Sequence, residues 1–168
     1  LSYVVIGFYT LIAMTCLYGG VVSMEAMNQS LPNMDSKGKR ISVSPTNKFI
    51  TVLSSLLASY IVQLIGVFLL FAFLLFVLKI DFGSHILLCI LLSIIGSLAG
   101  LSIGLFVSTV LKTNENTKVG IIISISMVYS FLSGMMGITM KYIIDKNVPL
   151  LNQINPANMI TDGFYSLY

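Results

Sequence analysis

Residues 49–78 read FITVLSSLLASYIVQLIGVFLLFAFLLFVL, thirty residues without a single Asp, Glu, Lys or Arg. A helix rises about 1.5 Å per residue, so roughly 20 apolar residues cross the roughly 30 Å hydrocarbon core of a bilayer. Three other stretches lack the same four residue types and are also long enough: 1–24, 82–111 and 119–140. The sequence therefore predicts a polytopic membrane protein with four spans.

The composition supports this prediction, with 57% hydrophobic residues, 9% charged residues and a mean hydropathy of +0.97. Soluble domains carry about 25% charged residues. Only helices and closed barrels satisfy their backbone in lipid, and these apolar runs lack the alternation of barrel strands. We expect an all-α fold in a single transmembrane domain, 1–168, with four transmembrane helices at about 3–24, 49–78, 85–111 and 119–140 and one short interfacial helix.

The start of the chain does not indicate a signal peptide. The sequence begins at Leu1 instead of Met, and no basic region or small-residue cleavage site flanks the first apolar run. We therefore expect the chain to be a fragment of a longer polypeptide.

The nine basic residues predict the orientation, because short cytoplasmic loops collect Lys and Arg. Six of them lie in 25–48 and 112–118, and three lie in the 79–84 turn and the 141–168 tail. We expect the first pair of segments in the cytoplasm, and the N-terminus, the turn and the tail outside. The net charge of +3 then reflects topology and attraction to membrane lipids, and nothing in the chain resembles a nucleic-acid-binding module.

The segment 25–48 is the one sizeable polar stretch on the predicted cytoplasmic side. It contains the basic run Lys37-Gly38-Lys39-Arg40, followed by Ser44-Pro45. Proline suits the first helical position and serine suits the cap before it, so we expect one continuous helix from Ser44 to Leu78. Two interpretations stay open: a topology signal with lipid-facing lysines, or a docking element for a cytoplasmic partner.

The third span carries Gly96, Gly100 and Gly104 at every fourth position. Small residues at this spacing let helix backbones approach closely in lipid, so they predict a packing seam within the chain or between subunits. The spans otherwise contain mild polar residues, among them Ser59, Tyr60 and Gln63 in the second. No residue there is ionisable at neutral pH, whereas ion-coupled transporters need such a group, so we expect the energy for any transport to come from elsewhere.

Cysteine and metal chemistry are not indicated. Cys16 and Cys89 lie in different apolar runs, where a thiol behaves as a small hydrophobe. Asp81 and His85 are four residues apart, but no third ligand is near, and we expect no metal site.

The tail from Lys141 to Tyr168 mixes polar residues with short apolar pieces and cannot cross a bilayer. Asn155 as a cap and Pro156 at the first helical position predict a short helix through about Tyr168. We expect this helix at the outer interface, with three aromatic anchors: Phe164, Tyr165 and Tyr168.

This order of parts resembles the membrane-spanning permeases of type 2 ABC transporters, and the chain looks like their second to fifth spans. The resemblance rests on Asp35-Ser-Lys37-Gly38-Lys39-Arg40 and Ser44-Pro45 between two spans, on the short outer turn, and on the glycine-rich span. It also rests on the polar link from Lys112 to Lys118 and on Asn155-Pro156 before an expected further span.

The resemblance implies a permease of an ATP-driven exporter that moves a lipophilic or amphipathic substrate across the plasma membrane of a bacterium. It implies that a separate ATPase subunit docks under 25–48 and that a second permease copy or homologue completes the pathway. The chain has no Gly-x-x-x-x-Gly-Lys-Ser/Thr loop, so we expect ATP and Mg on the partner and no cofactor here. Our hypothesis within this family is that two sets of residues carry the function: Lys37, Gly38, Lys39, Arg40 and Pro45 couple the movement of the ATPase to the spans, and Ser59, Tyr60 and Gln63 line the substrate route.

Two alternatives belong to other functional classes. A non-transporting scaffold or immunity-type subunit would use the glycine seam for assembly and would need no polar pathway. An intramembrane enzyme is disfavoured, because the spans contain no His-Glu-x-x-His sequence, carboxylate pair or Ser-Lys or Ser-His dyad.

Overall fold

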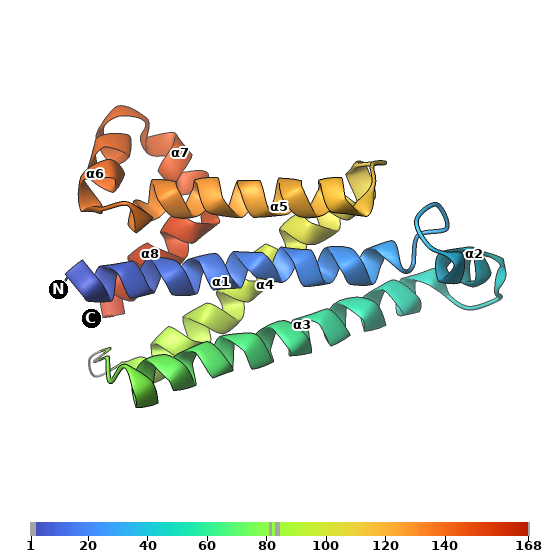
Figure 1. Cartoon of the computed structure of the whole chain (residues 1–168), viewed down its shortest axis with the longest axis horizontal. Coiled ribbons are helices and arrows are strands. Elements are labelled where there is room, and N and C mark those ends of the chain that lie inside the picture. The colour runs from blue at the N-terminus through green and yellow to red at the C-terminus, as the bar shows by residue number, and fades with distance from the viewer. Residues whose placement is uncertain (1–2, 81, 83–84, 168) are drawn as a thin grey trace.

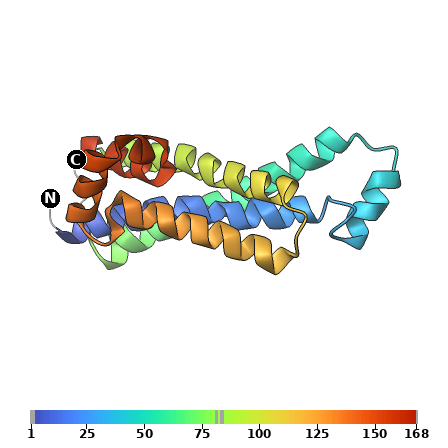
Figure 2. The same ribbon diagram turned by 90° about the horizontal axis from the view of Figure 1, so that it is seen from above.

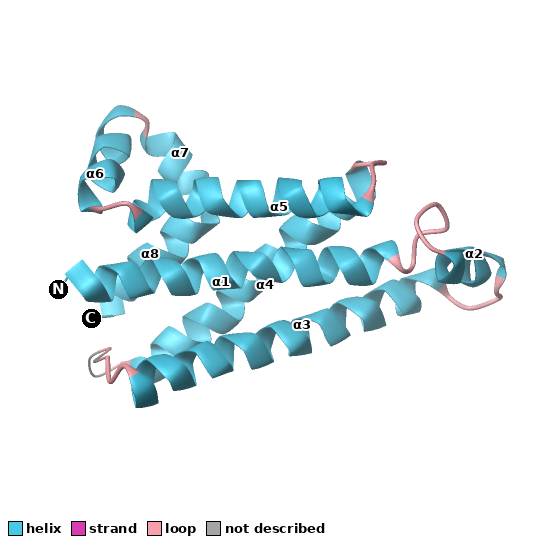
Figure 3. Cartoon of the chain, viewed as in Figure 1, coloured by secondary structure: helices cyan, strands magenta, loops and turns pink. Residues whose placement is uncertain are grey.

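The computed structural model describes residues 3–80, 82 and 85–167, and this part of the chain is helical without a strand. Figure 3 shows the helices joined by short loops. The all-α prediction is confirmed. The helices are α1 (Tyr3–Asn28), α2 (Ser36–Val43), α3 (Lys48–Ala72), α4 (Ile86–Val110), α5 (Glu115–Ser130), α6 (Ile138–Asn147), α7 (Pro149–Ile154) and α8 (Pro156–Leu167).

Four helices are long and apolar enough to cross a membrane, as the sequence predicts. They cover Val4–Asn28, Lys48–Val77, Ile86–Val110 and Glu115–Met135. The second and fourth of these each end in a π-helical turn, Phe73–Val77 after α3 and Phe131–Met135 after α5.

Helix α1 lies at the centre of the bundle, with α3 and α5 on either side of it and α4 crossing behind it (Figure 1). It contacts α3, α4, α5 and α8. Half of its most apolar window is buried, compared with 22% for α3. Helix α1 is therefore the element on which the other spans pack.

The contact between α1 and α4 is a close approach of two backbones. A Cβ atom added at Gly100 would clash with the Cys16 carbonyl, and one added at Gly104 would clash with the Gly20 carbonyl. The Ser23 hydroxyl donates across the same contact to the Leu101 carbonyl at 2.9 Å. Small residues therefore allow dispersion contacts and a hydrogen bond that larger side chains would prevent.

Aromatic rings fill the core where α8 folds back against α1. Tyr9 stacks on Phe164 with ring centroids 5.1 Å apart, and it meets Phe82 and Tyr165 at 5.9 Å each. The Asn155 side chain caps α8 by accepting from the Ala157 amide at 3.0 Å, so the predicted helix forms. The expectation of Phe164 as an interfacial anchor is wrong, because that ring is fully buried; Tyr168 lies outside the described residues.

The helix of the second span does not extend back to Ser44, as the sequence suggested. Ser44 ends α2 in an extended conformation, which is the conformation that a following proline imposes, and α3 begins at Lys48. Asn47 is the cap, since its side chain accepts from the Phe49 amide at 3.1 Å. The expected continuous helix from Ser44 to Leu78 is therefore wrong: Pro45 separates two helices instead of opening one.

The fourth span ends earlier than the expected residue 140. Gly134 and Gly137 have φ angles of 109° and 125°, a region that favours glycine, and they turn the chain into α6. The residues after Gly137 consequently belong to a separate short helix outside the span.

The two ends of the bundle differ in charge. Helix α2 and the link between α4 and α5 lie at one end, beyond which α2 protrudes (Figures 1 and 2). The end of the π-helical turn after α3, the start of α4 and helices α6–α8 belong to the other end. Six of the nine basic residues lie at the α2 end, which the positive-inside rule predicts to be cytoplasmic.

The glycine contact gives a direct test of the packing. Gly104→Ala should lower the free energy of unfolding by about 1–3 kcal/mol, because its new methyl group meets the α1 backbone. Gly66→Ala is the matched control, since a Cβ there meets nothing within 4 Å. Thermal unfolding in detergent, followed by circular dichroism, measures both. Equal stability of the two variants would contradict the close contact.

Candidate functional site

The basic run lies on α2, at the tip of the α2 end. The side chains of Lys37, Lys39 and Arg40 are exposed, and Val43 at the end of the helix is 86% exposed. Pro45, which follows α2, is exposed as well. The structure therefore brings three cations and an apolar residue together on a short helix that extends away from the bundle.

Gly38 faces the chain instead of the outside. It is buried, and a Cβ atom there would clash with the Leu31 carbonyl. The glycine lets α2 lie directly against the backbone at 31–32. Gly38 therefore positions α2, whereas the exposed side chains of its neighbours Lys37 and Lys39 can contact a partner.

The three polar residues predicted along the substrate route all bond to neighbouring backbone. Gln63 Nε2 donates to the Thr15 carbonyl of α1 at 2.7 Å, and the Tyr60 hydroxyl donates to the Ile94 carbonyl of α4 at 2.9 Å. The Ser59 hydroxyl donates to Ser55 at 2.8 Å, within α3. In this conformation Gln63 and Tyr60 join α3 to α1 and α4, and a role of the three residues in the route stays a prediction.

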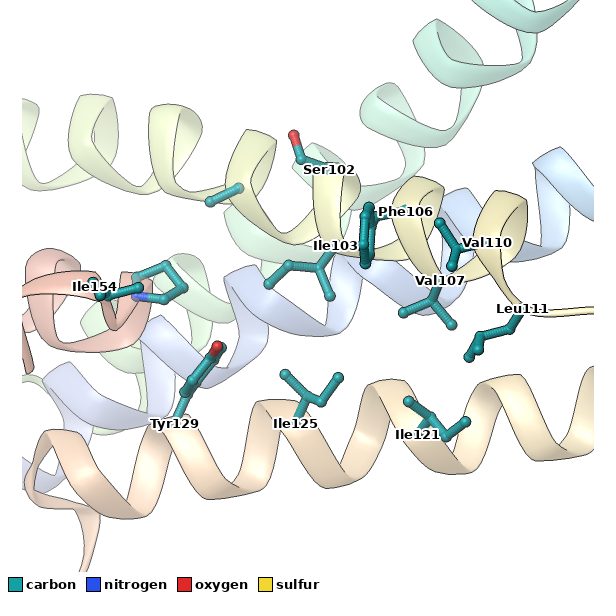
Figure 4. A pocket seen from close by; sticks show the side chains of 12 residues that line it. Ser102, Ile103, Phe106, Val107, Val110, Leu111, Ile121, Ile125, Tyr129 and Ile154 are labelled. Atoms are coloured by element: carbon teal, nitrogen blue, oxygen red, sulfur yellow. The ribbon is translucent and has the colours of Figure 1, made fainter. Parts of the chain in front are cut away.

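A groove of about 600 Å³ lies between α4 and α5, and the sequence analysis did not anticipate it. In Figure 4, Ile103 and Val107 of α4 face Ile121 and Ile125 of α5 across it. Tyr129 and Ile154 stand at its outer end. The signal was present in the sequence as apolar residues at every fourth position of both helices, but a core seam would produce the same pattern.

Lys118 is buried at the α2 end of the bundle, although the sequence placed it in a polar cytoplasmic link. Its Nζ donates to Asn28 Oδ1 at 3.0 Å and to the Ser108 carbonyl at 2.9 Å, and the Ser108 hydroxyl donates to the same Asn28 oxygen at 2.8 Å. This cluster, Asn28–Ser108–Lys118, joins α1, α4 and α5. It was missed because the three residues are far apart in the sequence.

A second polar cluster lies at the opposite end, on α6–α8. Lys141 forms an ion pair with Asp162 and lies 4.7 Å from the centroid of the Tyr165 ring. Asn152 Nδ2 donates to Asp145 at 2.6 Å. Within the described residues no three His, Cys, Asp or Glu side chains gather as a metal site would need, and Asp81 lies outside them.

The arrangement is therefore a set of closely packed spans with a basic helix at one end and a short-helix cap at the other. The family described as ABC-2 family transporter protein matches residues 1–168, the whole of the chain. The chain belongs to this family. No curated protein and no solved structure shows a significant match to it.

Membership of the ABC-2 family confirms the resemblance that the sequence suggested. The chain is a multi-pass membrane protein and a permease component of an ABC transporter. ABC-2 membrane subunits generally pair with an ATPase subunit, and membership of the family indicates a permease subunit. The residues of interest are therefore those that contact partners or change neighbours.

The Asn28–Ser108–Lys118 cluster can be tested by a double-mutant cycle of Asn28→Ala and Lys118→Ala. Because Nζ bonds Asn28 directly, the two changes should show a coupling energy of at least about 1 kcal/mol in unfolding. The cycle of Lys118→Ala with Ser124→Ala is the control, since the Ser124 hydroxyl bonds only its own helix, at Gly120. Additive effects in both cycles would contradict the cluster.

Proposed function

We propose that the chain is the membrane permease of an ATP-driven exporter and that α2 docks on the ATPase subunit. The observation that carries this proposal is the exposed basic face of α2, held beyond the ends of the spans (Figure 2). Family membership supplies the class of partner. ATP and Mg are held by that partner, whose movement reaches the spans through α2.

The chemistry of α2 indicates what the ATPase presents. Lys37, Lys39 and Arg40 give three positive charges on eight residues, and Asp35 is the acidic residue just before the helix. Complementary potentials guide association and suppress wrong partners. The docking cleft should therefore carry carboxylates around an apolar pocket that receives Val43.

The proposed route at Ser59, Tyr60 and Gln63 requires α3 to move. The Tyr60 and Gln63 side chains bond the backbone of α4 and α1, so they become available to a substrate only when those hydrogen bonds break. An apolar wall with a few such groups suits a lipophilic or amphipathic substrate. A second permease copy or homologue forms the other wall, in the plasma membrane of a bacterium.

The scaffold alternative has less support. It uses the glycine seam for assembly between subunits, but Gly100 and Gly104 face α1 of the same chain. Gly96 faces Ile160 of α8, whose Cδ1 would lie 2.7 Å from an added Cβ atom. These three positions are therefore not free to join another subunit.

Docking through α2 is tested by replacing Lys39 and Arg40 with Ala in the natural full-length protein. Loss of two exposed charges at a charged interface should weaken ATPase retention about tenfold or more and uncouple transport from ATP hydrolysis. Co-purification in mild detergent measures retention, and export from reconstituted vesicles measures coupling.

The double variant Lys79→Ala, Lys146→Ala is the matched control, because it removes the same charge from the opposite end of the bundle. It should retain the ATPase and transport normally. Unchanged retention and export in the Lys39/Arg40 variant would refute docking at α2. Export without any ATPase would refute the ATP-driven class itself.

A further inference from the structure

The α4–α5 groove lies at the depth of the bilayer, since both of its walls are helices long and apolar enough to span a membrane. Phe106 and Val110 on its rim are 66% and 55% exposed. Its floor rests on a buried cluster in which Met24 of α1 packs with Val107 and Ile122. The groove is thus an apolar depression with a closely packed cluster of side chains beneath it.

The length of the groove matches one leaflet. Its wall on α4 runs from Ala99 to Leu111, which is about 18 Å at 1.5 Å per residue. Half of the roughly 30 Å hydrocarbon core is about 15 Å. An extended acyl chain of a lipid in one leaflet therefore fits along the groove from end to end.

The α2 end of the groove carries positive charge. Lys112 follows the lining residue Leu111 and is exposed, and Lys118 lies one turn before the lining residue Ile121. Among the described residues, Lys118 forms no ion pair, and the buried Nδ2 atom of Asn28 beside it has no hydrogen-bond partner. Glu115, which is exposed, is the acidic residue of this link, so the net charge there is positive.

We propose that the α4–α5 groove binds one acyl chain of an anionic phospholipid from the leaflet on the α2 side, with the lipid phosphate beside Lys112. The apolar groove holds the chain, and the exposed Lys112 favours a headgroup with net negative charge. The lipid would add contacts between α4 and α5 along the groove. The proposal needs only the membrane placement of the chain and is independent of docking at α2.

The volume argues against a helix as the occupant. A helix 18 Å long and 10 Å across takes up roughly 1,400 Å³, which is more than the groove can enclose. A further span or a second copy would therefore lie across the mouth without filling the floor. A single acyl chain is narrow enough to reach Ile103 and Val107.

The 168 residues contain no Trp, so a Trp introduced among them adds a fluorescent probe at one chosen position. Phe106→Trp places the probe in the groove, and Leu69→Trp places it on the exposed face of α3 as a control. The natural full-length protein is reconstituted in vesicles of phosphatidylcholine that contain a small fraction of phosphatidylglycerol. In separate samples the acyl chains of one lipid or the other are brominated, and fluorescence of the unsubstituted protein is subtracted.

Brominated phosphatidylglycerol should quench the F106W probe about fivefold more effectively per lipid than brominated phosphatidylcholine, as expected for about 1 kcal/mol from a surface lysine. The two lipids should quench L69W equally. Adding Lys112→Gln should remove the preference at F106W, whereas Lys146→Gln at the opposite end should leave it unchanged. Val110→Trp, on the same rim, repeats the measurement if F106W lowers the helix content.

Three results would overturn the proposal. Equal quenching of F106W by both lipids would mean ordinary boundary lipid without a site. Absence of quenching by either lipid would mean that a protein segment covers the groove. A preference that survives Lys112→Gln would show that the phosphate does not lie beside this lysine. These three fluorescence results do not depend on whether the Lys39 and Arg40 variants lose the ATPase.

Discussion

The close contact between α1 and α4 is the constraint on which the rest of the bundle depends. Lipid is as apolar as the side chains, so apolar burial alone does not drive spans together, and close packing must do it. Gly20, Gly100 and Gly104 let the two backbones touch, and Ser23 adds a hydrogen bond to Leu101. Helices α3, α5 and α8 then pack on this pair, and the α4–α5 groove remains where no such contact forms.

Much of the fold could be predicted from the sequence, because the bilayer imposes a single rule on every span. Length and absence of charge were sufficient to locate four helices. The ends of the helices were harder to predict, because the same residue can have two effects. Pro45 can begin a helix or separate two helices, and here it separates them, with Ser44 at the end of α2. Gly134 and Gly137 form the turn that ends the fourth span, but the apolar residues around them made this segment resemble a continuous span.

The candidate sites were predicted less well, because their residues meet only in three dimensions. The basic run was visible as a run, and it lies together on α2. The burial of Lys118 depends on Asn28, ninety residues away, and no pattern within the link announced it. Phe164 resembled an interfacial anchor by composition, but Tyr9 provides a ring on which it stacks. Sequence periodicity likewise cannot distinguish a closely packed contact between two helices from an open groove such as the one between α4 and α5.

The position of α2 between α1 and α3 has a mechanical consequence. Short connections join it to both helices, so a displacement of α2 pulls on two elements of unequal stiffness. Helix α1 is surrounded by four helices, whereas most of α3 faces outward. Helix α1 is therefore held firmly in place, whereas α3 is freer to move. A displacement of α2 would move α3 more than α1, and this movement would break the hydrogen bonds that hold the polar side chains of α3.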